Sequence, residues 1–310
     1  MAMSVLNAFT VDVEDYFQVS AFERHIGREQ WNDCQCRVVP STQRILRLLE
    51  RYQVRGTFFI LGWVAERFPQ LVREIDRAGH EIGSHSYWHR LVYDLTPEQF
   101  RADLQRSRDA LQQIIGQEVT AYRAPSFSIT ERSLWALEIL VQEGFTADSS
   151  IFPIYHDRYG IPSAEHRIHD LQVPAGSLRE FPPSVVSWGR MNFPVSGGGY
   201  FRLYPWQLTR CALQAINGRG RPFTFYLHPW EVDPEQPRLA AGTRLGRLRH
   251  YVNLNGTERK LEQLLQAFRF GPQREVLAAV DQATMPVVDL AATMQQWLVP
   301  PVSAGLSAES

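Results

Sequence analysis

Two histidines, His85 and His89, are the residues whose types and spacing point most directly to chemistry. Side chains four residues apart lie on the same side of a helical turn, so both imidazoles could reach one ion at the distances that a zinc site requires. Gly79 suits a helix end, and the apolar residues after it indicate a short buried strand. We therefore expect the histidine pair at the end of a strand, where α/β folds collect ligands and catalytic groups.

Three carboxylates, Asp12, Glu14 and Asp15, lie at the end of an apolar stretch that spans residues 5–13. The stretch is typical of a buried strand in a parallel sheet. Carboxylates crowded at a strand end repel one another unless a cation neutralises them. Asp12 and Glu14 share one face of the strand, whereas Asp15 follows the strand and could turn either way. The cluster therefore predicts a second group of side chains that face a cation.

Three further polar residues, Arg123, Asp148 and His228, follow or end later strand patterns. Beside an acidic cluster, a fixed cation such as Arg123 orients one carboxylate. Pro229 follows His228 and restricts the backbone there, so the imidazole is held in one place. Because the carboxyl ends of parallel strands meet at one edge, we expect all these groups on the same rim.

Strand and helix patterns alternate along the chain. The sequence predicts strands at residues 5–13, 54–61, 80–83, 119–122, 145–150 and 222–227. It predicts helices at residues 41–52, 65–77, 96–115, 130–143, 205–217 and 256–269. Ser41 and Thr96 are the expected N-caps of the first and third of these helices. The alternation favours parallel pairing with right-handed crossovers, so we expect an α/β fold.

Residues 152–204 differ from the rest, because they are rich in proline, glycine and aromatic residues and show little helical period. Long irregular segments inside a compact domain are usually functional or disordered, and the aromatic content argues against disorder. Rigid loops that carry Trp188 and Tyr200 would suit a carbohydrate, because sugar rings stack on aromatic rings. We therefore expect irregular aromatic loops over the rim.

The composition indicates a large core and no strong overall charge. The 310 residues are 44% hydrophobic and carry a net charge of -1, which argues against a nucleic-acid partner. No stretch approaches the apolar length of a membrane span, and the first residues lack a secretory signal, so we expect a cytoplasmic protein. Three cysteines are too few for a disulfide framework. The sequence leaves the oligomeric state open.

Five short motifs in order make the chain resemble the polysaccharide deacetylase family. They are Asp12-Val13-Glu14-Asp15, His85-Ser86-Tyr87-Trp88-His89, Arg123-Ala124-Pro125, Asp148 and Leu227-His228. This family is also called carbohydrate esterase family 4, and its catalytic part is the NodB homology domain. The first motif departs from the family pattern, in which two aspartates are adjacent. The resemblance implies a distorted (β/α) barrel with about seven parallel strands. It also implies a divalent metal ion, with Zn²⁺ as the first choice, and removal of N-acetyl groups from an amino-sugar polysaccharide.

More narrowly, residues 10–17, 197–202 and 225–231 resemble the subgroup found in bacterial exopolysaccharide loci with exosortase and PEP-CTERM sorting. This resemblance implies an exopolysaccharide substrate. The five motifs lie within residues 5–230, and we expect residues 1–300 to form one catalytic domain. In that domain residues 231–300 would be a C-terminal helical extension, and residues 301–310 would be a disordered tail.

The family resemblance also implies catalytic roles. Asp12 would act as the base, oriented by Arg123. His228 would act as the acid, and Asp148 would keep its imidazole in the right tautomer or charge state.

Ligand roles are implied in the same way. The metal would bind His85, His89 and one carboxylate, which is either Glu14, by strand alternation, or Asp15, if the turn is one residue longer. Substrate contacts are expected from Pro125, Trp188, Tyr200, Leu227 and Trp230.

Two functions from other classes are alternatives. One is an amidohydrolase for small molecules, such as the metal-independent allantoinase relatives in the same wider superfamily. Those lack the intact ligand set, so His85 and His89 count against this alternative. The other is a catalytically silent sugar-binding barrel, which would not need the base and acid that Asp12 and His228 supply.

Overall fold

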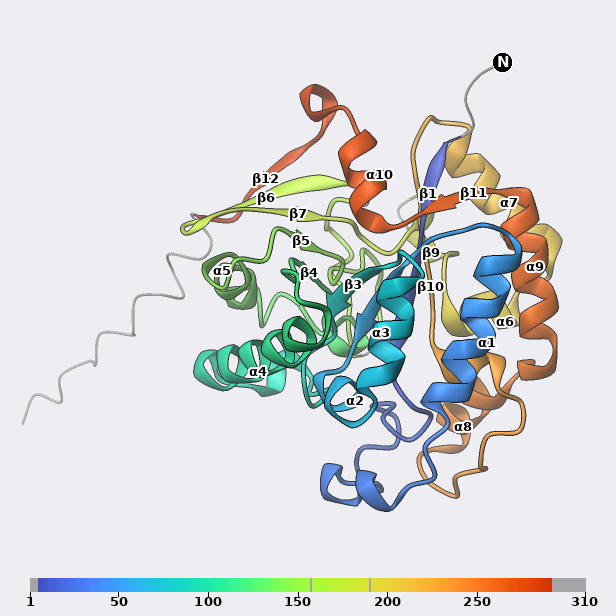
Figure 1. The fold of residues 1–310 in the computed structure, drawn as a ribbon. Helices are drawn as coiled ribbons and strands as arrows, with labels where there is room; N and C mark the ends of the chain where they lie inside the picture. Colours follow the sequence, from blue (N-terminus) through green and yellow to red (C-terminus); the bar gives the residue numbers. More distant parts are fainter. Residues whose placement is uncertain (1–4, 157, 190, 292–310) are drawn as a thin grey trace, which may run out of the picture.

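A ten-stranded, mostly parallel sheet organises the protein (Figure 1). The computed structural model describes residues 5–156, 158–189 and 191–291. The strands of the sheet are β1 (Leu6–Val13), β2 (Thr57–Ile60), β3 (Glu81–Ser84), β4 (Ala121–Tyr122), β5 (Ala147–Asp148), β6 (His169–Val173), β7 (Gly176–Glu180), β10 (Thr224–Leu227), β11 (Arg269–Gly271) and β12 (Val287–Asp289). A separate hairpin pairs β8 (Val185–Trp188) with β9 (Met191–Pro194).

The strands follow the order β10-β1-β2-β3-β4-β5-β7-β6-β12, and β11 also pairs with β1. Every pairing from β10 to β7 is parallel, so the prediction of an α/β fold with about seven parallel strands is confirmed. Within the described residues, no strand ladder joins β7 back to β10. Instead, the N–H of Thr224 donates to Ser184 Oγ at 3.0 Å, and the N–H of Tyr226 donates to the carbonyl of Ser196 at 2.9 Å. Irregular backbone therefore lies between β7 and β10, where a closed barrel would have paired strands.

The helices flank this sheet, and α1 to α5 follow one another along one side of it (Figure 1). They are α1 (Val38–Arg51), α2 (Gly62–Arg67), α3 (Pro69–Arg77), α4 (Pro97–Ile115), α5 (Trp135–Gln142), α6 (Gly198–Leu203), α7 (Trp206–Asn217), α8 (Arg244–Tyr251), α9 (Thr257–Ala267) and α10 (Gln273–Ala279). The single helix predicted at 65–77 is wrong: it is two helices, because Pro69 has no N–H to continue the first and instead begins the second. None of the described helices is long and apolar enough to cross a membrane.

The C-terminal part of the chain is less helical than the sequence indicates. Between α8 and residue 291, it also supplies β11 beside β1 and β12 beside β6. The expected helical extension contains α8, α9 and α10, and the two short strands were not predicted, because segments such as Arg269–Gly271 complete an existing sheet edge and need no periodicity of their own. The tail predicted at 301–310 lies outside the described residues.

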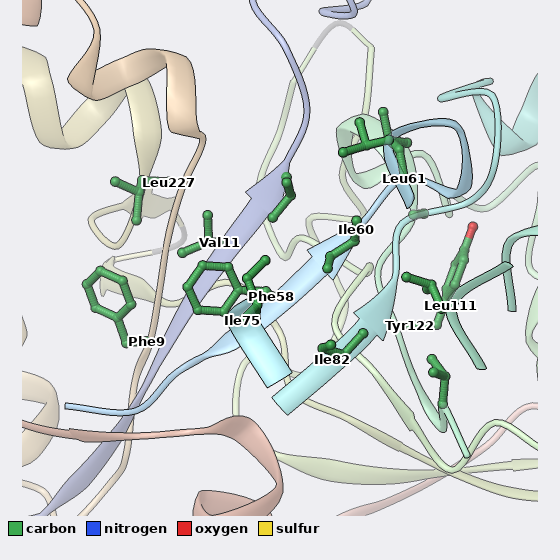
Figure 2. Packing of buried hydrophobic residues seen from close by; sticks show 14 of the residues in the cluster. Phe9, Val11, Phe58, Ile60, Leu61, Ile75, Ile82, Leu111, Tyr122 and Leu227 are labelled. Carbon is green, nitrogen blue, oxygen red and sulfur yellow. The ribbon is translucent and has the colours of Figure 1, made fainter. Parts of the chain in front are cut away.

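One continuous apolar core fills the space between the parallel strands and the helices (Figure 2). Phe58 from β2 lies among side chains of β1, β3 and the neighbouring helices, including Val11, Ile75 and Ile82. Phe58 is completely buried, so removal of its ring would cost about 3–5 kcal/mol of the free energy of unfolding. This core fixes the strands, and the strands fix the rim on which the polar residues lie.

Candidate active site

Aligned strand ends bring the predicted site residues to one rim. Parallel registers place the last residues of five strands in one row: Val13, Ile60, Ser84, Tyr122 and Asp148. The residues that follow three of these positions, Glu14, His85 and Arg123, therefore leave the sheet side by side. On the other side of β1, the pairing with β10 sets Asp12 level with His228. The expectation of a shared rim is confirmed.

His85 and His89 meet across a loop and not on a helical turn. Residues 85–90 form no helix, and Ser86 and His89 have φ angles of 64° and 51°. The loop is held from α4, because Asp103 accepts the N–H of Tyr87 at 2.7 Å. The helical turn expected from the four-residue spacing is therefore wrong, since a buried carboxylate binds the N–H groups that a helix would use. The two imidazole rings still lie close, with centroids 5.4 Å apart.

Glu14, His85 and His89 form the one cluster of metal-type side chains within the described residues, with ligand atoms all within 4.8 Å of one another. The three side chains are buried. His85 Nδ1 donates to the carbonyl of Arg123 at 2.8 Å, which leaves Nε2 of this ring free to bind an ion. Glu14 Oε2 lies 2.6 Å from His89 Nε2, yet no hydrogen bond of good geometry reaches Oε2 within the described residues. The carboxylate oxygen and the imidazole nitrogens are thus close enough to bind one cation.

The electrostatics of this cluster also fit a divalent ion. Burial would raise the pKa of Glu14, but the imidazoles of His89, His228 and His85 outweigh burial and hold that pKa well below its usual value. Burial lowers the pKa of His85 to about 4, so this ring is neutral near pH 7. A carboxylate and neutral imidazoles are the protonation states that a metal requires. The residues present therefore fit the metal that the family resemblance implies.

Asp15, the other candidate for the metal carboxylate, lies outside the cluster and has a different task. Its Oδ2 accepts the N–H of Arg37 at 2.7 Å and of Val38 at 2.9 Å, at the first turn of α1. Asp15 therefore caps α1, which begins at Val38 and not after the predicted N-cap Ser41. Burial raises the pKa of Asp15 to about 6 despite these hydrogen bonds.

Asp12 is held by the buried cation of Arg123, as the sequence predicts. Arg123 NH1 donates to Asp12 Oδ1 and to Thr10 Oγ1, each at 2.7 Å. The guanidinium is fully buried and lies over the ring of Phe59 at 4.3 Å. The other oxygen of Asp12, Oδ2, is 3.9 Å from His228 Nε2. One carboxylate oxygen is thus fixed, and the second faces the site.

His228 is oriented by Glu231, a residue to which the sequence patterns assigned no role. Glu231 Oε1 lies 2.8 Å from His228 Nδ1, and because a carboxylate only accepts, Nδ1 carries the hydrogen. Glu231 is bound in turn by Arg202 Nε at 2.7 Å. Burial would lower the pKa of His228, but the charges of Glu14, Glu231 and Asp12 raise it to about 9. A capping-box spacing could have identified this carboxylate from the sequence. Glu231 follows His228 by three residues, and Pro229 is the first residue of the short helical turn between them.

Asp148 does not contact His228, so the predicted pairing of these two residues is wrong. Asp148 and Glu180 are register partners on β5 and β7, which points both fully buried carboxyls to the same side of the sheet. Asp148 accepts the hydroxyl of Ser150 and shares a hydrogen bond with Glu180. Burial raises the pKa of Asp148 to about 6, and burial together with Asp148 raises the pKa of Glu180 well above its usual value. One proton is therefore shared by the pair near neutral pH.

A cavity of about 330 Å³ opens above the rim. Glu14, His89 and His228 lie on its wall, and so do two of the predicted substrate residues, Tyr200 and Trp230. The indole of Trp230 stacks between His228, with centroids 5.0 Å apart, and His250. Trp230 Nε1 also donates to Glu14 Oε1 at 3.2 Å.

The other predicted substrate residues do not line this cavity. Pro125 and Leu227 are buried, because they continue the backbone that supports the rim. Trp188 lies on the β8–β9 hairpin and is 78% exposed. The hairpin is tied to the rim loops, since Asn192 Nδ2 donates to the carbonyl of Pro153.

Two family models match this chain in succession. Residues 31–145 match the polysaccharide deacetylase model, and residues 149–278 match a domain of unknown function, DUF3473. His85, His89 and Arg123 fall in the first range, whereas Arg202, His228 and Glu231 fall in the second.

Curated relatives match shorter parts of the chain. A peptidoglycan-N-acetylglucosamine deacetylase of Bacillus cereus is 35% identical over 98 residues, which are 31% of this chain and 36% of that protein. A peptidoglycan deacetylase of Helicobacter pylori is 30% identical over 168 residues, which are 52% of this chain and 55% of that protein. The matches thus span between about a third and about half of these relatives' lengths. A candidate polysaccharide deacetylase of Mycobacterium smegmatis has a solved structure similar to this chain, with a TM-score of 0.62 and 21% identity, covering 91% of this chain and 92% of that one. That similarity shows a common fold.

Proposed function

From the match of residues 31–145 to the polysaccharide deacetylase model, we propose that this chain belongs to that family and hydrolyses the N-acetyl groups of an amino-sugar polysaccharide. We propose that Glu14, His85 and His89 hold a divalent ion, which their two imidazoles and one carboxylate suit best as Zn²⁺. When bound, such an ion polarises a carbonyl and makes water a stronger nucleophile near neutral pH. The observation that carries the proposal is the position of Asp12 and His228, a base and an acid 3.9 Å apart beside this cluster.

The residues of the chain divide the two proton transfers between them. Asp12 Oδ2 accepts a proton from the water that attacks the acetyl carbon, while Arg123 holds Oδ1 in place. The C–N bond then breaks, and His228 Nε2 gives its proton to the leaving amine. The hydrogen bond and charge of Glu231 favour the protonated form of His228, which is the form needed for this step. Acetate and a free amino sugar are the products.

The proposed substrate is a polymer, in agreement with the exopolysaccharide that the subgroup resemblance implies. The site is an open cavity of about 330 Å³ with aromatic walls, and Trp188, which does not line it, offers a further exposed aromatic face. Aromatic faces bind successive sugar rings. We also propose that residues 1–300 act as one catalytic domain, since His85 and His228 come from the two matched ranges and lie at one site.

Acetate release from N-acetylglucosamine oligomers, measured against allantoin and simple cyclic imides, tests this function. We expect acetate from the oligomers, with a loss of about 10²-fold or more in kcat for Asp12→Asn and for His228→Ala. Faster turnover of a cyclic imide would support the small-molecule amidohydrolase instead. Sugar binding without acetate release from any oligomer would support a silent binding barrel.

A further inference from the structure

Two arginines from distant parts of the chain lie at the mouth of the cavity. Arg158 belongs to the loop after β5, and Arg249 belongs to α8. Both side chains line the cavity, and both residues are exposed. Within the described residues, neither guanidinium forms an ion pair. They are therefore two positive charges that no described carboxylate neutralises.

The other charged groups on the cavity wall are already compensated. Arg202 is bound to Glu231 at 2.7 Å, and both side chains are buried. Glu14 Oε1 lies 3.6 Å from His228 Nε2, whose ring also pairs with Glu231 at 2.8 Å. With these pairs set aside, the charge that remains at the mouth is the positive charge of Arg158 and Arg249.

The two arginines line the same cavity and act on the same side chain, Tyr159. Burial, together with a hydrogen bond to Tyr200, raises the pKa of the Tyr159 phenol far above its usual value, and the charges of Arg158 and Arg249 act in the opposite direction. Tyr159 and Tyr200 line the same cavity, so the charges flank an aromatic wall that suits a sugar ring.

The backbone beneath each arginine is held in place. The carbonyl of Arg249 accepts a hydrogen bond from Arg202 NH2 at 3.0 Å, and the N–H of Arg158 donates to His156 Nδ1 at 3.2 Å. A guanidinium presents a fork of N–H donors that matches a carboxylate, phosphate or sulfate group in geometry and in charge. Two guanidinium groups without a described carboxylate partner, on well-held backbone beside one cavity, thus favour an anionic ligand.

We propose that the polysaccharide bound here is anionic, with a carboxylate, sulfate or phosphate group on a sugar next to the N-acetylated one, which Arg158 and Arg249 bind. This inference rests on the proposed deacetylase function and narrows its substrate class.

Two tetrasaccharides of equal length test the inference. One alternates N-acetylglucosamine with glucuronic acid, and the other contains N-acetylglucosamine alone. We expect kcat/KM for acetate release to be about tenfold higher per acetyl group for the acidic tetrasaccharide at low salt, and this preference to shrink as salt screens the exposed charges. Arg158→Gln and Arg249→Gln should each lower the ratio of acidic to neutral substrate. Arg210→Gln, which changes an exposed arginine on α7 outside the cavity, is the matched control and should keep the ratio.

The failure of this inference differs from a failure of the proposed function. Equal kcat/KM values for the two tetrasaccharides would overturn the inference and leave the deacetylase function standing. If neither tetrasaccharide releases acetate, calorimetric binding to Asp12→Asn decides the question without turnover. Tighter binding of the acidic tetrasaccharide, lost in Arg158→Gln and Arg249→Gln, would support the inference, and equal binding would overturn it. A sulfated oligomer in the same titration distinguishes sulfate from carboxylate as the preferred group.

Discussion

Glu231 Oε1 lies 2.8 Å from Nδ1 of His228 and also accepts the backbone N–H of the same residue at 3.0 Å. One carboxylate oxygen thus fixes both the ring and the backbone of the proposed acid. Burial would raise the pKa of Glu231, but Arg202 and His228 lower it to about 2, so the carboxylate is ionised at any working pH. Its negative charge favours the protonated imidazole that must deliver a proton.

Glu231→Gln should lower kcat by about 10–100-fold, because an amide of the same shape removes the charge that supports His228. The alkaline limb of the pH–rate profile should also move to lower pH, since the pKa of His228 is raised in part by Glu231. A purely structural role for Glu231 would lower activity equally at every pH. Full pH–rate profiles of wild type and Glu231→Gln distinguish the two, and an unchanged alkaline limb would remove Glu231 from the mechanism.

Glu14→Gln, His85→Ala and His89→Ala should each reduce the bound divalent metal by about tenfold or more, because each removes one of three protein ligands. Asp15→Asn should keep the metal, since Asp15 caps α1. Metal analysis of the purified variants measures this directly.

Asp15→Asn should instead lower the free energy of unfolding by about 1–3 kcal/mol, because an acceptor of buried N–H groups is weakened. Chemical denaturation of the same samples checks this expectation. Loss of metal from Asp15→Asn with retention in Glu14→Gln would reverse the assignment of the carboxylate.

The Asp148–Glu180 pair should make the protein less stable as the pH rises. In the folded protein the pKa of Asp148 is about 6, and the pKa of Glu180 is also raised. In the unfolded chain both carboxyls would have pKa values of about 4. Between these pH values the native state therefore binds more protons than the unfolded state. The stability from this shared proton is present at low pH and is lost as pH rises through the folded pKa values. Glu180→Gln mimics the protonated form and should reduce the stability difference between about pH 5 and about pH 8, by on the order of 1–3 kcal/mol.

Urea denaturation of wild type and Glu180→Gln at both pH values measures this difference. Glu235→Gln is the matched control, because its carboxylate is 77% exposed. An equal pH dependence in wild type and Glu180→Gln would show that the pair does not share a proton.

Trp188→Ala should reduce kcat/KM for a hexamer of N-acetylglucosamine by about tenfold while changing that for the monosaccharide little, because Trp188 lies outside the cavity and can stack only on a distant ring. Leu208→Ala, at an apolar residue of α7 that is 55% exposed, controls for the loss of surface apolar area. Equal effects on hexamer and monosaccharide would exclude Trp188 from substrate binding.

The rim was predictable because it depends on local patterns. Buried apolar stretches predict parallel strands, and parallel strands place their last residues at one edge, so the amino-acid sequence alone is enough to bring Asp12, Arg123 and His228 together. The capping box of Thr96 and Gln99 is equally local, and α4 begins where it predicts.

The errors arise where a side chain meets a backbone far away in the sequence. Asp15 caps α1 from 22 residues earlier, which displaces Ser41 from the N-cap and removes Asp15 from the metal candidates. The carboxylate of Asp103 on α4 likewise shapes the loop of His85 and His89. Spacing alone could not show either contact, because both depend on how the helices lie against the rim.

Arg202 joins the backbone of residues 249–252 on the cavity wall to Glu231, the partner of the proposed proton donor His228. Its guanidinium binds Glu231 and also the carbonyls of Arg249, His250 and Val252. If this backbone moved outward together with Arg202, Glu231 would stay buried without its cation. Such an arrangement costs several kcal/mol. The wall and His228 therefore behave as one cooperative unit. In the proposed reaction, a ligand that binds Arg249 should also hold the imidazole in place, so part of its binding energy should appear as faster C–N cleavage and not as a lower KM.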